Sequence, residues 1–158
     1  SGAKEDAGGP AESAVVFRLG AEWFALPSVC IREVAMPAPV HVIPHRSSRV
    51  LLGLVNIAGG LELCVSLYAL LGLDAAACEE DEARRRLVVF AHAGQTWVFP
   101  VDEVQGVQPF ERASIQPPPV TVARAAATYT RGVLTGPDRS ICFLDTGLVG
   151  AGFQRSIE

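Results

Sequence analysis

The chain has 158 residues, 49% of them hydrophobic, which suffices for the core of one domain or of two small ones. Its 13 basic and 17 acidic residues give a formal net charge of −4. This balance excludes the basic surface that binding to nucleic acid or to anionic membranes requires. The four cysteines lie far apart without a Cys-x-x-Cys pair. We therefore expect reduced, mostly buried thiols in a cytoplasmic protein.

The first predicted elements are strands. Residues 1–13 are rich in glycine, alanine and serine and predict a flexible arm. An apolar strand begins at Val15, turns at Gly20 and is followed by a second strand that ends at Pro27. A segment with spaced apolar residues then closes on Val34.

The stretch GLVNIAGGLELCVSL, residues 53–67, predicts a hairpin. Apolar and polar residues alternate from Leu61 to Leu67, which is the period of a strand with one face inward. Asparagine and glycine at the turn tolerate positive φ. The next segment, LYALLG at residues 67–72, predicts a short helix that Gly72 ends.

A charged run, CEEDEARRR at residues 78–86, predicts an exposed linker with one or two turns of helix. Beyond it the first pattern recurs, because Val88-Val89-Phe90 repeats Val15-Val16-Phe17 at an offset of 73 residues. The same offset relates Pro27 to Pro100, Ile31 to Val104, and Val34 to Val107. A duplicated unit explains these matches.

The hairpin recurs as well, at an offset of 79 residues. Gly53-Leu54-Val55 matches Gly132-Val133-Leu134, and Ser66 matches Asp145. The difference between the two offsets falls in connecting loops, where insertions are tolerated.

The remaining segments complete the prediction. QPPP at residues 116–119 disfavours helix, and residues 122–129 predict a second short helix. Short strands with regular turns favour small closed barrels, which are marginal alone and would share a core. We expect one domain over residues 14–150, followed by a tail at residues 151–158. Within it the first barrel covers about residues 17–75, the linker residues 76–86, and the second barrel about residues 87–146.

A membrane span is disfavoured. Residues 51–73 are long enough and carry one charge. That charge, Glu62, would lie at the centre of the bilayer, at a cost of roughly 2.5–3.5 kcal/mol. Asn56 and the glycine pair at residues 59–60 also weaken a helix there, so we expect no direct membrane insertion.

No catalytic or metal-binding pattern is evident. His41 and His45 flank Pro44, which disfavours the helix that would align them as ligands, and His92 precedes a turn. The glycine pair is not followed by a lysine or a helix start, as a phosphate-binding loop requires. We therefore expect no catalytic residue, metal or cofactor. The alternative is a double-barrel enzyme or small-ligand-binding protein of unknown substrate.

The hairpin of residues 53–67 instead suggests binding. It is apolar at Leu54, Val55 and Ile57 up to its tip, whereas a lone barrel usually has polar loops. An exposed apolar tip indicates a protein partner. Each turn residue taken alone is equally explained as an ordinary turn.

The sequence resembles the CheW-like domain family over about residues 14–150. The first half carries VVFRLGAEWFALP, IREV and VLLGLVNIAGGLELCVSLYALLGL; the second carries RLVVFAHAGQTWVFPVDEVQGV, IQPPP and YTRGVLTGPDRSICFLD. The resemblance implies a mainly β fold of two five-stranded SH3-like barrels with short helices. It also implies a bacterial, non-enzymatic scaffold that couples the cytoplasmic tip of a chemoreceptor to the regulatory domain of a CheA-type histidine kinase.

The resemblance also implies where partners bind. In this family one end of a barrel packs on the kinase domain and the groove between the barrels holds the receptor hairpin. Carried over to this sequence, the partner-binding residues are Ile31, Glu33, Val34, Asn56, Ile57, Ala58 and Gly59.

Two departures from the family stand out. Ala58 replaces the usual arginine, and Ser66 replaces the usual aspartate, whereas Asp145 remains in the second copy. If the missing acid and base formed a pair, losing both would cost less than losing one. The departures favour a divergent coupling protein, serving a non-flagellar system such as surface sensing or pili.

Overall fold

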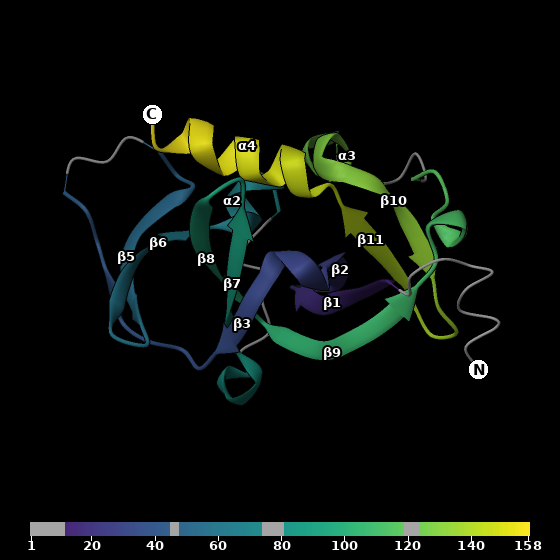
Figure 1. The fold of residues 1–158 in the computed structure, drawn as a ribbon, viewed down its shortest axis with the longest axis horizontal. Helices are drawn as coiled ribbons and strands as arrows, with labels where there is room; N and C mark the ends of the chain where they lie inside the picture. The colour runs from purple at the N-terminus through teal and green to yellow at the C-terminus, as the bar shows by residue number, and fades with distance from the viewer. Residues whose placement is uncertain (1–11, 45–47, 74–80, 119–123) are drawn as a thin grey trace.

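The computed structural model describes residues 12–44, 48–73, 81–118 and 124–158, which form mainly strands (Figure 1). The strands are β1 (Glu12–Leu19), β2 (Glu22–Pro27), β3 (Ile31–Ala35), β4 (Val40–His41), β5 (Leu51–Ile57), β6 (Gly60–Val65), β7 (Arg86–His92), β8 (Gln95–Val101), β9 (Glu103–Phe110), β10 (Thr130–Thr135) and β11 (Ser140–Leu144). The α-helices are α2 (Leu67–Leu70), α3 (Arg124–Tyr129) and α4 (Thr146–Ser156). Short 3-10 turns are η1 (Ser28–Cys30), η3 (Glu82–Arg84) and η4 (Arg112–Ser114).

The strands form two sheets. Sheet A has the order β10-β11-β2-β1-β9, and sheet B has the order β3-β7-β8-β6-β5-β4. The mainly β prediction is confirmed, but neither sheet closes into a barrel through its described strands. Sheet A comes near to closing. Gln116, in the segment after β9, forms one antiparallel bridge with Val133 of β10.

Each sheet combines strands from both sequence copies. The hairpin β1–β2 of the first copy lies in sheet A among β9, β10 and β11 of the second, while β7–β8 lies in sheet B among strands of the first. The expected division into barrels of consecutive residues, 17–75 and 87–146, therefore does not match the sheets. The chain crosses between sheets after β2 and again after β8. The first hairpin of each sequence copy therefore pairs with strands of the other copy.

The pairing register repeats between the sheets. Phe17 faces Val104 and Val16 faces Gly106, while in sheet B Phe90 faces Ile31 and Val89 faces Glu33. Both pairings shift register at this same step, so a β-bulge recurs at the same place. These partners differ by 73 residues, as the sequence offset predicts. The internal duplication is thus visible in the backbone pairing.

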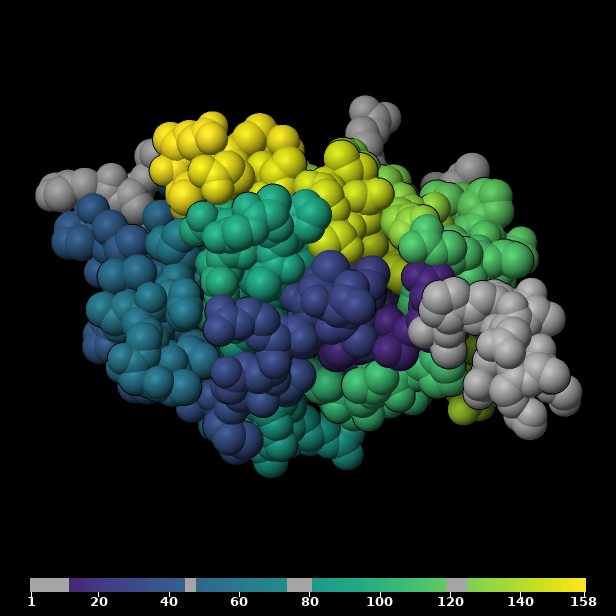
Figure 2. Space-filling model, viewed as in Figure 1, coloured from purple at the N-terminus to yellow at the C-terminus, as the bar shows by residue number. Residues whose placement is uncertain are grey.

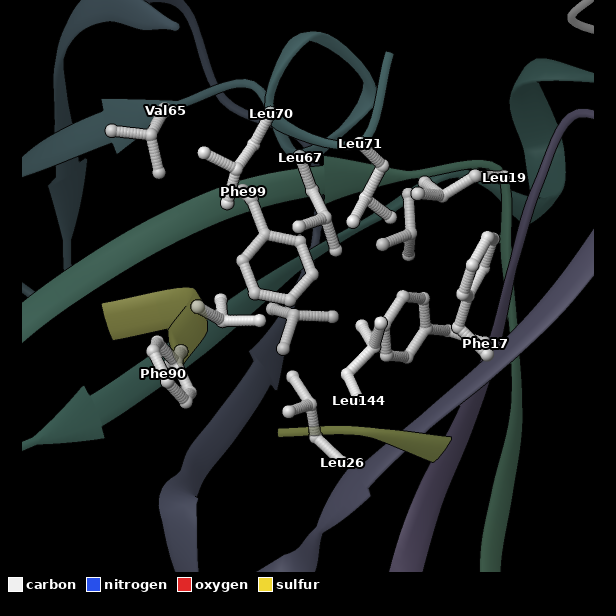
Figure 3. Close-up of a cluster of buried hydrophobic side chains, with 14 of the residues drawn as sticks. Phe17, Leu19, Leu26, Val65, Leu67, Leu70, Leu71, Phe90, Phe99 and Leu144 are labelled. Atoms are coloured by element: carbon white, nitrogen blue, oxygen red, sulfur yellow. The ribbon is translucent and has the colours of Figure 1, made fainter. Parts of the chain in front are cut away.

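The largest hydrophobic cluster lies between the two sheets (Figure 3). Phe17 and Phe24 of sheet A meet Phe90, Trp97 and Phe99 of sheet B. Each sheet also has a smaller cluster of its own, around Phe143 in sheet A and Val98 in sheet B. We call the large cluster the shared core. The prediction that the two copies share a core is confirmed.

The helices complete the shared core. The predicted short helices are present as α2 and α3, and Leu67 and Leu71 pack in the shared core. Most of residues 151–158, expected as a tail, instead belong to α4, which ends at Ser156 and whose Phe153 is fully buried against Trp97. The sequence analysis did not predict this helix, because TGLVGAGFQRS contains three glycines and glycine has a low helix propensity.

Several further expectations can be placed. The predicted arm falls mostly outside the described residues, although Glu12 and Ser13 already belong to β1. Among the described helices, none is long and apolar enough to cross a bilayer. Cys64 is buried, and burial raises the pKa of its thiol to about 11, which keeps it neutral at physiological pH. Cys78 lies outside the described residues.

Candidate functional site

The β5–β6 hairpin ends in a two-residue turn at Ala58 and Gly59. Both have positive φ, 51° and 88°, which matches the right-handed twist of a hairpin. The Asn56 side chain accepts a hydrogen bond from the Gly59 N–H at 3.0 Å and so fixes the turn. Asn56, Ala58 and Gly59 are all exposed, which leaves the tip accessible to a partner.

The apolar residues of this hairpin are less exposed than the sequence suggested. Val55 is buried, and Ile57 is half-buried against the cluster of sheet B. The exposed apolar residue beside the tip is Leu61, 61% exposed, which the sequence analysis did not single out. Strand alternation predicted an inward face for Leu61, but the sheet ends before any element covers it.

β3 carries the other predicted residues. Ile31 is half-buried against the shared core, Glu33 is exposed, and Val34 is 40% exposed. Their equivalents on β9 behave alike. Val104 also packs on the shared core, and Val107 is 68% exposed. An exposed valine thus recurs on the outermost strand of each sheet, and we call Val34 and Val107 the valine pair.

The two predicted groups lie on different parts of sheet B. Three strands, β7, β8 and β6, separate β3 from β5 in the sheet order. The sheet curls, however, so that Ala35 at the end of β3 and Ile57 at the tip pack on the same buried cluster. Figure 2 shows the segment that contains β3 adjoining the β5–β6 hairpin on one face. The seven predicted residues therefore form two neighbouring patches and no enclosed site.

The two departures from the family do not form a pair. Ala58 lies at the turn, whereas Ser66 follows the other end of β6. A six-residue strand spans about 20 Å, far beyond the length of a salt bridge. Ser66 caps α2 by accepting the Ala69 N–H at 3.1 Å, and Asp145 caps α4 by accepting the Leu148 N–H at 2.9 Å. The interpretation of a joint loss is wrong, because serine and aspartate serve here as alternative helix caps.

A buried polar cluster that the sequence analysis missed lies where the chain crosses from β8 to β9. Asp102 accepts hydrogen bonds from the Gly20 N–H at 2.7 Å and from the Tyr68 hydroxyl. Arg18 donates to Glu103 at 3.1 Å and to the Gly20 carbonyl at 2.7 Å. The cluster joins the β1–β2 turn, α2 and the crossing. A Val-Asp dipeptide at a strand end was its only sequence signal.

The described residues offer no cluster of metal ligands. Among residues 12–44, 48–73, 81–118 and 124–158, no group of three or more histidine, cysteine, aspartate or glutamate side chains could hold a metal ion. His41 lies in the edge strand β4 and His92 at the end of β7, so they are not neighbours in the sheet order. His45 is outside the described residues.

The profile of the CheW-like domain family matches residues 13–150. The chain is 28% identical to the chemotaxis protein CheW of Rhizobium meliloti over 141 residues, which are 89% of this chain and 88% of that protein. The crystal structure of the scaffolding protein TtCheW from Thermoanaerobacter tengcongensis superposes with a TM-score of 0.71 at 24% identity, covering 85% of this chain and 89% of that one. That likeness shows a common fold of two SH3-like halves. The chain therefore belongs to the CheW-like domain family, whose members are non-enzymatic scaffolds that couple chemoreceptors to a CheA-type histidine kinase.

Proposed function

We propose that this chain joins the cytoplasmic tip of a chemoreceptor to the regulatory domain of a CheA-type kinase through two separate patches. One patch lies on β3, with Ile31, Glu33 and Val34, and the other is the β5–β6 tip, residues 56–59. The observation that carries the proposal is the family match over nearly the whole chain. Glu33 and Val34 of the first patch and Asn56, Ala58 and Gly59 of the second are exposed, so each patch is accessible to a partner.

The exposed Val34 on β3, which has an equivalent in Val107 on β9, supports the receptor contact. Val34 and Val107 are exposed on strands whose neighbouring residues, Ile31 and Val104, pack on the shared core. A helix binds best where exposed apolar side chains stand on a rigid base. We assign the receptor's helical hairpin to this patch, with Glu33 as a charged residue at its edge.

The β5–β6 tip supports the kinase contact. Its turn is fixed by the Asn56–Gly59 hydrogen bond, and Leu61 exposes an apolar side chain beside it. Ala58 offers no charge where the family usually has arginine. The kinase contact here consequently relies on the hairpin backbone and apolar side chains. This altered contact fits an accessory coupling protein in a non-flagellar system, working in the cytoplasm.

Calorimetric titration of the receptor tip and of the kinase regulatory domain, encoded near this chain, tests the assignment. Val34→Asp places a charge in the receptor patch and should weaken receptor binding at least about tenfold while sparing the kinase. Val42→Asp, at an exposed apolar residue outside both patches, is the matched control and should change neither affinity. Equal effects of both variants on receptor binding would contradict the assignment.

A second variant tests the tip. Ala58→Arg restores the side chain that the family usually has, and we expect tighter kinase binding with receptor binding unchanged. Unchanged kinase affinity would place the kinase contact elsewhere.

A further inference from the structure

A pocket of about 360 Å³ lies between the β7–β8 turn and α4. Its lining includes His92, Gln95, Trp97, Gly147, Gly150 and Gln154. Figure 2 shows the teal β7–β8 turn beside the yellow helix α4 on the exposed face. The volume falls at the lower end of the range for sites that hold small molecules or side chains, about 300–1,000 Å³.

The same place in the other half of the molecule is filled. The sequence offsets make Leu19 equivalent to His92, Tyr68 to Gly147, and Leu71 to Gly150. Leu19 and Leu71 are fully buried in the shared core. The Tyr68 ring occupies the position where α4 has a glycine without a side chain. At Gly150 the His92 ring covers the backbone, because a Cβ there would lie 3.0 Å from His92 Cδ2. The open space therefore corresponds to Tyr68, which Gly147 replaces in this half.

The backbones at these two places are alike, so the difference lies in the side chains. The β1–β2 and β7–β8 turns both begin with positive φ, 62° at Gly20 and 52° at Ala93. The helices α2 and α4 both start after a capping side chain, at Ser66 and Asp145. The second half has the same turn and capped helix start as the first, but it has no side chain at the position of the Tyr68 ring.

The hydrogen-bond partner of that tyrosine is also absent from this half. Asp102, which accepts from Tyr68, is equivalent to Val29, and Val29 is 94% exposed. Polar groups remain at the pocket in His92, Gln95 and Gln154. A tyrosine brought in from outside could hydrogen-bond to one of these side chains, whereas Trp97, which is 1% exposed, offers almost no ring surface for stacking.

The pocket also continues the proposed receptor patch. The Cys30 thiol donates to the Thr146 hydroxyl at 3.6 Å, which links η1 to the first turn of α4. η1 leads directly into β3, which carries Ile31 and Val34. A partner lying on β3 can therefore reach α4 across the exposed Val29.

We infer that this pocket receives one aromatic side chain, preferably tyrosine, from a helix of the receptor tip; the identity of that partner rests on the proposed function. Gly147 and Ala151 are exposed small residues on α4 that let a second helix approach its backbone, whereas Gly150 is buried beneath His92. The inserted ring takes the position that Tyr68 holds in the other half.

The pocket is tested on the full chain with p-cresol, the side-chain analogue of tyrosine, followed by nitrogen-15 NMR. Saturable shifts should be confined to the Trp97 indole and to the amides of Gly147, Gly150 and Ala151. Gly147→Tyr refills the pocket from within and should abolish these shifts. A Cβ at Gly147 is tolerated, because it would lie 3.4 Å from Asp145 Oδ1 and 4.0 Å from His92 Nε2, both ordinary contacts. Gly147→Ala is the matched control, since it removes the same helical glycine but leaves the pocket open.

No saturable shift in the native protein at millimolar p-cresol, or equal shifts in a folded Gly147→Tyr variant, would overturn the inference. Should Gly147→Tyr fail to fold, the native protein and Gly147→Ala decide it by the location of their shifts. Receptor-tip titrations then test the partner, where Gly147→Tyr should weaken binding at least about tenfold and Gly147→Ala should not. If native protein binds no receptor tip, the proposed function fails, while the p-cresol result still decides the pocket.

Discussion

The two crossings between the sheets occupy equivalent positions in the duplicated sequence but are built in opposite ways. At the crossing from β8 to β9, Asp102 is 4% exposed and joins the Gly20 turn to Tyr68 of α2. At the crossing from β2 to β3, the equivalent Val29 is 94% exposed. Both halves have kept the same strand pairing. The residue at one crossing is buried and hydrogen-bonded, whereas its equivalent at the other crossing is exposed to solvent. An adaptor needs both, a rigid frame and a free surface.

The largest expected effect is on the shared core, because it belongs to both halves. Phe90→Ala should lower the free energy of unfolding by about 3–5 kcal/mol, since Phe90 is fully buried among Phe99, His92 and Phe153. The indole NMR signals of Trp23 in sheet A and Trp97 in sheet B, followed through a urea titration, should disappear at one common midpoint. Two separate midpoints in the native protein would show that the halves unfold independently.

A smaller effect distinguishes the two crossings. Asp102→Ala removes the acceptor of two buried hydrogen bonds and should destabilise the protein by about 1–3 kcal/mol. Val29→Ala, its equivalent, should change stability by less than about 0.5 kcal/mol because the side chain is exposed. Urea midpoints of the two variants give the comparison. Equal losses would mean that the crossings are not differently anchored.

The smallest effect concerns the helix caps. Ser66→Ala should cost about 1 kcal/mol of unfolding free energy by leaving the Ala69 N–H without its acceptor. Ser66→Asp, which copies Asp145, should be close to neutral because both residues are good caps. Thermal unfolding of the two variants checks this. A large gain from Ser66→Asp would revive the view that the missing aspartate had a different role.

The sequence was sufficient for the features that repeat locally. The hairpins and their turns follow from alternation and glycine placement, and the two offsets identify the equivalent strands. The bulge that recurs in both pairings was not predicted. The sequence could not predict that β1–β2 and β7–β8 each lie in the sheet of the other copy. An offset shows which strands are equivalent and not which strands pair. α4 was missed for another reason, since its glycines lower helix propensity while Phe153 and Val149, buried in the shared core, supply the stability.

For the candidate site too, local features could be predicted from the sequence and contacts between distant segments could not. The turn at Ala58 and Gly59 was correctly placed. That these residues, together with Glu33 and Val34, bind partners stays a prediction. Ile57 was expected at an exposed tip and is half-buried, because the cluster of sheet B extends to the end of the hairpin. The importance of Val107, the pocket beside α4 and the Asp102 cluster depends on contacts between distant segments, which alternation and spacing do not reveal.

The central claim is that this chain bridges two partners, and a retention assay tests it most directly. The receptor tip is immobilised, and the kinase regulatory domain is passed over it with and without the chain. We predict that the kinase domain is retained only when the chain is present, and that Val34→Asp abolishes this retention. Retention that does not depend on the chain, or kinase that displaces the chain from the receptor, would contradict the account.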